Sequence, residues 1–171
     1  LMVLLGPTDN ISSLKSDENK TKSNRLCFES ERLSLQKQTQ ETIDSLKKAV
    51  ELNPDNSTAL CLLGGVLNEQ SNPDCVSYYE KSLEKNKNCY LAYRGLGNFY
   101  LKNQQFDKSE KNYTHAIEIN DNRFGPIYKN RGYVRQQQNK MNEAKEDYQS
   151  YIKFTPNAKD RGMIERALNE M

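Results

Sequence analysis

The sequence predicts an all-α fold, a solenoid of antiparallel helix pairs that ends in a capping helix. The first observation is a repeat: segments that begin at Thr58, Leu91 and Ile127 read TALCLLGGVL, LAYRGLGNFY and IYKNRGYVRQ. The second is that another amphipathic stretch follows each segment, so that one repeat of about 34 residues holds two helices. The third is a mean hydropathy of −0.95, which is low for a compact globule but fits an array whose units contact only their neighbours.

Turn residues mark where these helices end. The run from Thr42 to Leu52 carries one apolar stripe and stops at Asn53-Pro54-Asp55. Proline ends a helix because it lacks the amide hydrogen and its ring clashes with the preceding turn. The same ending recurs as Phe154-Thr155-Pro156-Asn157.

These signals divide the chain into six expected segments. Residues 1–22 are predicted to be a flexible N-terminal segment, because the stretch from Pro7 to Asn24 is polar and lacks helical periodicity. About four helical hairpins are expected after it, of which the first is degenerate, followed by a capping helix. Their predicted ranges are 23–56, 57–89, 90–123 and 124–158 for the hairpins and 159–171 for the cap.

The hairpins resemble the tetratricopeptide repeat (TPR). That family has a large residue, Leu-Gly and Tyr on the first helix, then Ala, an aromatic residue and Ala on the second, closing in Pro. The copy at 90–123 matches through Tyr93, Leu96, Gly97, Tyr100, Phe106, Ser109, Tyr113 and Ala116. The copy at 124–158 departs from the pattern with Arg131 in place of leucine and Arg135 in place of tyrosine. The resemblance implies a right-handed superhelix whose concave side is lined by the first helix of each pair.

Small residues at fixed places explain how such helices pack. Glycines on the first helices are expected to let the two helices of a hairpin approach closely, and small residues on the second helices to leave room for a neighbour. The glycines are Gly64, Gly97 and Gly132, and the small residues are Cys75, Ser109 and Ala144.

Composition limits the kinds of partner and compartment. With 25 basic and 23 acidic side chains, the net charge of +2 provides no field that would favour a nucleic acid. The apolar start from Leu1 to Leu5 is too short to span a membrane, although it could be the end of a signal or anchor segment. The four cysteines form no C-x-x-C pair, and buried reduced thiols are expected in the cytoplasm or another reducing compartment.

The sequence predicts a binding protein rather than an enzyme. It has no glycine-rich phosphate loop, nucleophile elbow or metal-ligand set, and one histidine alone indicates no catalytic pair, so no cofactor or metal is expected. The family phase places six residues on the concave side as a peptide-binding surface. They are Arg94, Asn98, Lys102, Lys129, Asn130 and Tyr133. Cations and amides suit an extended peptide with acidic groups or a free carboxylate.

Three functions remain open at this point. The first is a scaffold or adaptor, a monomeric subunit of a larger hetero-complex. The second is a carboxylate clamp for acidic C-terminal tails, as some members of the family have. Arg94, Asn98 and Asn130 fall on clamp positions, but Asp160 and Ile164 stand where the last two cations belong. The third is self-association of a longer protein through Leu1–Leu5 and the first hairpin.

Overall fold

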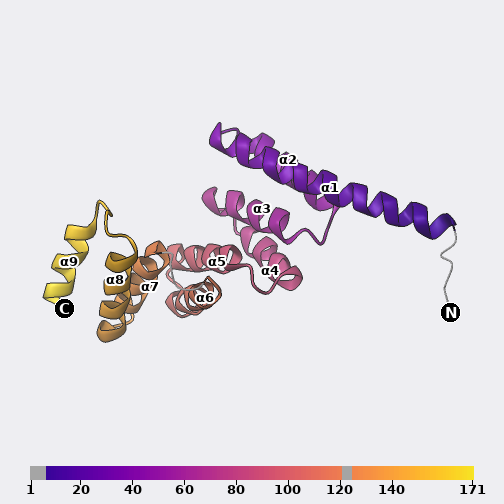
Figure 1. Ribbon diagram of the computed structural model, residues 1–171. Helices are drawn as coiled ribbons and strands as arrows, with labels where there is room; N and C mark the ends of the chain where they lie inside the picture. Colours follow the sequence, from indigo (N-terminus) through magenta and orange to yellow (C-terminus); the bar gives the residue numbers. More distant parts are fainter. Residues whose placement is uncertain (1–6, 121–124) are drawn as a thin grey trace, which may run out of the picture. The chain divides into compact units, whose positions relative to one another are not determined.

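The computed structural model describes residues 7–120 and 125–171, with side chains from residue 12 onward, and the regular elements in these ranges are helices (Figure 1). Leu1–Leu5 and the predicted boundary between residues 123 and 124 lie outside the described residues. The helices are α1 (Pro7–Leu35), α2 (Thr39–Leu52), α3 (Ser57–Glu69), α4 (Cys75–Lys85), α5 (Tyr90–Lys102), α6 (Phe106–Ile119), α7 (Gly125–Gln137), α8 (Met141–Phe154) and α9 (Arg161–Glu170). None of these helices is long and apolar enough to cross a membrane.

The chain divides between Lys87 and Asn88 into two compact units. In unit 1, α1 packs on α2, α2 on α3 and α3 on α4. In unit 2, α5 packs on α6, α6 on α7 and α7 on α8, while α9 contacts α8. Helices α5 and α7 also contact each other directly. Each unit is therefore built mainly from contacts between helices that are neighbours along the chain.

The N-terminal segment differs from its prediction. Residues 7–22 were expected to be flexible, but they form the first part of α1. The C-terminal half of α1 packs through small polar groups: Ser23 and Ser30 are buried, and the Ser23 hydroxyl donates to the Ala49 carbonyl at 2.7 Å. Residues 12–22 of α1 are exposed apart from the half-buried Asn19, so this part of the helix has no apolar stripe from which periodicity could predict it.

In each of the four hairpins, a turn of the same geometry joins the two helices. Each contains a residue with φ between 56° and 60°, in the left-handed region, although no glycine is used. The residue after each donates its amide to a carbonyl five positions back, at 2.9 to 3.0 Å, which is the Schellman ending of a helix. The left-handed residues are Lys37, Ser71, Gln104 and Asn139. The first hairpin, which looks degenerate in sequence, thus ends its first helix like the others.

The predicted close approach of the hairpin helices is confirmed. Gly64, Gly97 and Gly132 each face the ring of a buried tyrosine on the following helix. The three tyrosines are Tyr79, Tyr113 and Tyr148. The small residues Cys75, Ser109 and Ala144 are each fully buried beside them.

Candidate functional site

All six residues of the predicted binding surface lie in unit 2, on two helices that contact each other. Helix α5 carries Arg94, Asn98 and Lys102, and α7 carries Lys129, Asn130 and Tyr133. The four-residue spacing along α5 places its three residues on one side of the helix. We call the surface that bears these six residues the α5/α7 face.

A hydrogen-bond network connects the two helices at Asn98. The Tyr113 hydroxyl donates to Asn98 Oδ1 at 2.7 Å, and Asn130 Nδ2 donates to the same oxygen at 3.3 Å. An amide oxygen has two lone pairs, and both are occupied here. The polar group that Asn98 still offers to a ligand is therefore its NH₂ group, a hydrogen-bond donor.

The buried phenol of Tyr113 fixes this orientation. Burial raises the pKa of Tyr113 to about 12, against the smaller opposing effects of Asn130, Ser109 and the positive charge of Arg94. The phenol therefore stays protonated near neutral pH and acts as a donor to Asn98. The residue that packs against Gly97 thus also orients the amide of Asn98 on the α5/α7 face.

Lys129 already holds an ion pair. Its ammonium donates to Asp160 Oδ2 at 2.8 Å, and this bond raises the pKa of Lys129. The Tyr151 hydroxyl also donates to Asp160, and the pKa of Asp160 is lowered, first by the bond from Lys129 and then by the bond from Tyr151. Asp160 immediately precedes α9. The cation that α7 contributes to the face is therefore neutralised within the chain.

The remaining predicted residues differ in exposure. Arg94 is half-buried, and its charge acts on Tyr113. Lys102 is exposed in the last turn of α5, and Tyr133 is 47% exposed on α7. The structure thus brings Asn98 and Asn130 into direct contact and leaves Tyr133 open to solvent.

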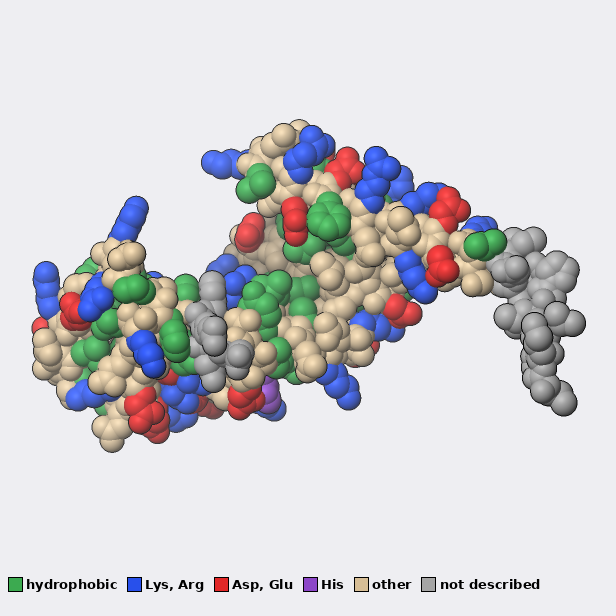
Figure 2. Space-filling view, viewed as in Figure 1, with side chains coloured by type: hydrophobic (Ala, Val, Ile, Leu, Met, Phe, Trp, Pro, Cys, Tyr) green, Lys and Arg blue, Asp and Glu red, His purple; other side chains and the backbone are tan. Residues whose placement is uncertain are grey.

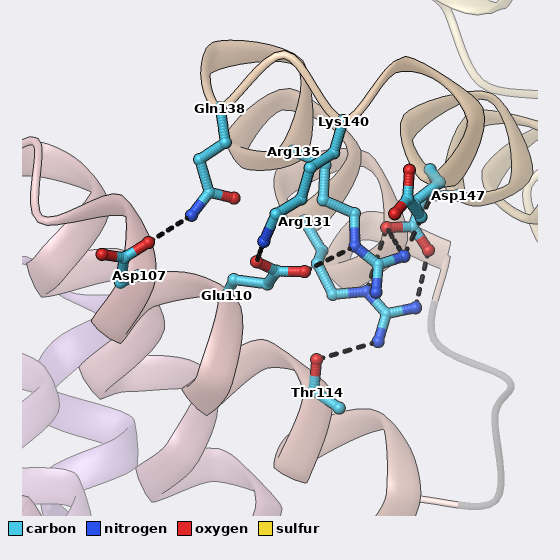
Figure 3. A network of polar contacts seen from close by, with 9 residues as sticks. Asp107, Glu110, Thr114, Arg131, Arg135, Gln138, Lys140 and Asp147 are labelled. Carbon is cyan, nitrogen blue, oxygen red and sulfur yellow. Dashed lines mark hydrogen bonds and ion pairs between the residues drawn. The ribbon is translucent and has the colours of Figure 1, made fainter.

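Behind this face, the two arginines that depart from the repeat pattern form a buried ionic network (Figure 3). Arg131 donates to both carboxylate oxygens of Asp147, at 2.9 and 2.6 Å, and to the Thr114 hydroxyl at 3.1 Å. Arg135 donates to Asp147 at 3.0 Å and to Glu110 at 2.9 Å. Asp147 is only 2% exposed, so the network ties α6, α7 and α8 together inside unit 2.

The edge of the network is more accessible. Lys140 pairs with Glu110 at 2.6 Å, and Gln138 donates to Asp107 at 2.7 Å. Desolvation acts to raise the pKa of Glu110, but the bonds from Lys140 and Arg135 outweigh it and leave that pKa lowered. Asp147 and Asp160, the two acids that organise these arginines and Lys129, were not among the predicted site residues. An arginine at a normally buried leucine position was the available signal, because a buried guanidinium needs a carboxylate partner.

Among the described residues, no group of three or more His, Cys, Asp and Glu side chains could hold a metal ion. Acidic and basic side chains lie intermixed over the visible surface in Figure 2. The arrangement is suited to hydrogen bonding and packing of a ligand, with amide donors at its centre.

Comparison with known proteins identifies the repeat. The family model of the tetratricopeptide repeat matches residues 92–123 and 126–157. A comparison with curated protein sequences finds no match.

Solved structures show the same fold at low sequence identity. PilF of Pseudomonas aeruginosa superposes with a TM-score of 0.78 at 18% identity, covering 91% of this chain and 69% of that chain. MamA superposes at 0.70 with 18% identity, covering 87% and 85%. YrrB, described as a TPR protein with an unusual peptide-binding site, superposes at 0.65 with 17% identity, covering 83% and 71%. The chain therefore carries tetratricopeptide repeats at residues 92–123 and 126–157 within an all-α helical-repeat fold, as the sequence predicted.

Proposed function

We propose that the chain is a non-enzymatic protein-interaction scaffold, acting as a subunit of a larger assembly, that binds an extended segment of a partner protein on the α5/α7 face. The tetratricopeptide repeats support the general role. YrrB, which shares the fold, is described as having a peptide-binding site.

The observation that carries this proposal is the fixed orientation of Asn98. With its oxygen bonded to Tyr113 and Asn130, Asn98 presents N–H donors on the face. An extended peptide offers one carbonyl acceptor per residue, so a side-chain amide donor can hold its backbone without reading its sequence. The exposed ring of Tyr133 adds apolar contact area, of the kind that concentrates binding energy at interfaces.

The test is an exchange of one atom type at Asn98. Peptides would be selected from a displayed random library on the purified chain, and their affinities measured by fluorescence anisotropy. Asn98→Asp keeps the acceptor for Tyr113 and Asn130 but removes the N–H donors and adds a negative charge. We expect it to weaken binding by about tenfold or more, the value of one lost hydrogen bond with unfavourable charge.

The matched control is Asn142→Asp, the same change at an exposed position on α8. Its affinity should equal that of wild type, and thermal melting should show that both variants fold. Equal affinities for wild type, Asn98→Asp and Asn142→Asp would exclude the α5/α7 face as the binding surface.

The carboxylate clamp has less support than the general peptide-binding role. A clamp needs free cations, yet Lys129 is paired with Asp160, and Arg161 donates to Glu165 at 2.8 Å on its own helix.

Self-association is tested separately by sedimentation at several concentrations, where a monomeric adaptor should show one concentration-independent species. We also propose a reducing compartment, because the four cysteines are thiols rather than disulfides in the described part of the chain, and three of them are buried.

A further inference from the structure

We propose that Asp160 determines the charge selectivity of the α5/α7 face, by cancelling the attraction of Lys129 for carboxylates, so that this end accepts a neutral part of the partner segment. This inference rests on the proposed function, because it concerns the ligand of the same face. It gives a specific role to Asp160, which in the sequence only occupies a position where the clamp pattern has a cation.

The first step is the occupancy of Lys129. Its ammonium lies 2.8 Å from Asp160 Oδ2, and the two side chains are 37% and 32% exposed. A ligand could therefore reach both groups, but it would meet a pair whose charges cancel. A ligand carboxylate would gain attraction to Lys129 only by displacing an acid that is part of the same chain and has no translational freedom to lose.

The second step is that Asp160 is held in place independently of Lys129. The Tyr151 hydroxyl also donates to it, and Ile164, one helical turn later, packs against the buried core cluster of unit 2. Displacement from Lys129 would leave the Asp160 charge close to the incoming carboxylate. Like charges at such short range repel and reject the wrong ligand.

The third step concerns Arg161, one of the two cations beside Asp160 in the sequence, the other being the exposed Lys159. Arg161 donates through Nε to Glu165 at 2.8 Å and through Nη1 to the Pro156 carbonyl at 3.2 Å. Its guanidinium is thus engaged within its own helix and the preceding turn. The Lys129 end of the face consequently presents an ion pair whose charges cancel, with the Arg161 guanidinium engaged elsewhere.

The experiment compares two pools of short labelled peptides with random interiors. One pool ends in Glu-Glu with a free carboxylate, and the other ends in Lys-Lys with an amidated terminus. The full chain is immobilised, and the ratio of acidic to basic peptide retained is measured for each variant. Asp160→Asn removes the charge but keeps an acceptor for Tyr151, and Glu146→Gln makes the same charge change at an exposed site on α8.

Asp160→Asn should raise the acidic-to-basic ratio by about threefold to tenfold, as expected for one accessible charge contact, and Glu146→Gln should leave it near the wild-type value. An unchanged ratio in Asp160→Asn would overturn the inference, and if binding still fell in Asn98→Asp, the proposed function would stand. Failure of both pools to bind wild type and every variant would overturn both.

Discussion

In the helix pair α5/α6, the position before the packing glycine is Leu96, an apolar residue that is 5% exposed. In α7/α8, the corresponding residue is Arg131, whose side chain is 11% exposed and bonded to Asp147. Both pairs bring a glycine against a tyrosine ring: Gly97 contacts Tyr113 in α5/α6, and Gly132 contacts Tyr148 in α7/α8. The comparison shows that the close helix approach defines the repeat, while the space beside it accepts either apolar or fully paired ionic side chains.

The largest expected effect comes from removing Asp147, the buried acid that pairs with both Arg131 and Arg135. Asp147→Ala leaves Arg131 without its main partner and Arg135 without one of its two acidic partners, in a buried site. We expect a loss of about 3–5 kcal/mol in the free energy of unfolding, measured by urea denaturation. Converting the site to the apolar version, with Arg131→Leu, Arg135→Tyr and Asp147→Leu together, should restore most of this loss. If Asp147→Ala alone melts like wild type, the network does not stabilise unit 2.

Alkaline pH tests a property that both pairs share. Burial is the main cause that raises the pKa values of Tyr113 and Tyr148 to about 12. Because the folded state holds these protons more tightly, their stabilisation is complete below pH 10 and is lost as pH rises from 10 to 12. The loss is about 2–3 kcal/mol for each phenol.

Ultraviolet titration of tyrosinate should show a late fraction that becomes smaller by two tyrosines in the double variant Tyr113→Phe, Tyr148→Phe. Titration of every tyrosine near pH 10 in the folded protein would show that neither phenol is buried as described.

The packing glycines should differ in their tolerance of a methyl group. A Cβ at Gly97 would lie 2.6 Å from the Tyr113 ring, whereas one at Gly132 would lie 3.1 Å from Tyr148. We expect Gly97→Ala to destabilise by about 1–3 kcal/mol through overpacking. Gly132→Ala should change stability by less than about 1 kcal/mol, because a small shift relieves the contact and alanine favours the helix. Thermal unfolding in parallel measures both, and a reversed order would contradict the tighter packing of α5 on α6.

The smallest expected difference lies in the hairpin turns. Gln104 and Asn139 occupy the same left-handed position, with φ of 56° and 60°. Gln104→Gly should stabilise by about 0.5–1 kcal/mol because it removes the strain of a side chain in this region. Asn139→Gly should have an effect below about 0.5 kcal/mol, since asparagine tolerates the conformation. Chemical denaturation can resolve the two variants, and equal shifts would show that residue type does not matter at this position.

Sequence reasoning predicted the features that depend on large apolar residues, glycine and proline. The stripe that ends at Leu52 and the glycine that faces Tyr113 follow from periodicity and size, and α2 ends at that leucine as predicted. It failed at residues 7–22, which belong to α1, because residues 12–22 are mostly exposed and have no hydrophobic pattern that would predict a helix.

The candidate face was predictable by helix phase but not in its electrostatics. The repeat pattern places Asn98 and Lys129 on first helices, and the structure confirms that placement. The pairing of Lys129 with Asp160 joins residues 31 positions apart through a bend before α9, so it depends on three-dimensional contacts that spacing alone does not give. The role of these residues as a binding surface stays a prediction.

The recurring left-handed turn also indicates where the chain can tolerate insertions. Gly64, Gly97 and Gly132 each precede the left-handed residue of their hairpin by seven positions, as in Gly97 and Gln104. After the turn the spacing varies: Ser71 precedes the buried Cys75 by four positions, whereas Gln104 precedes the buried Ser109 by five. A residue added between the glycine and the turn would rotate the rest of the first helix by about 100°, since a turn holds about 3.6 residues. Length variation among chains built this way should therefore collect after the turn rather than before it.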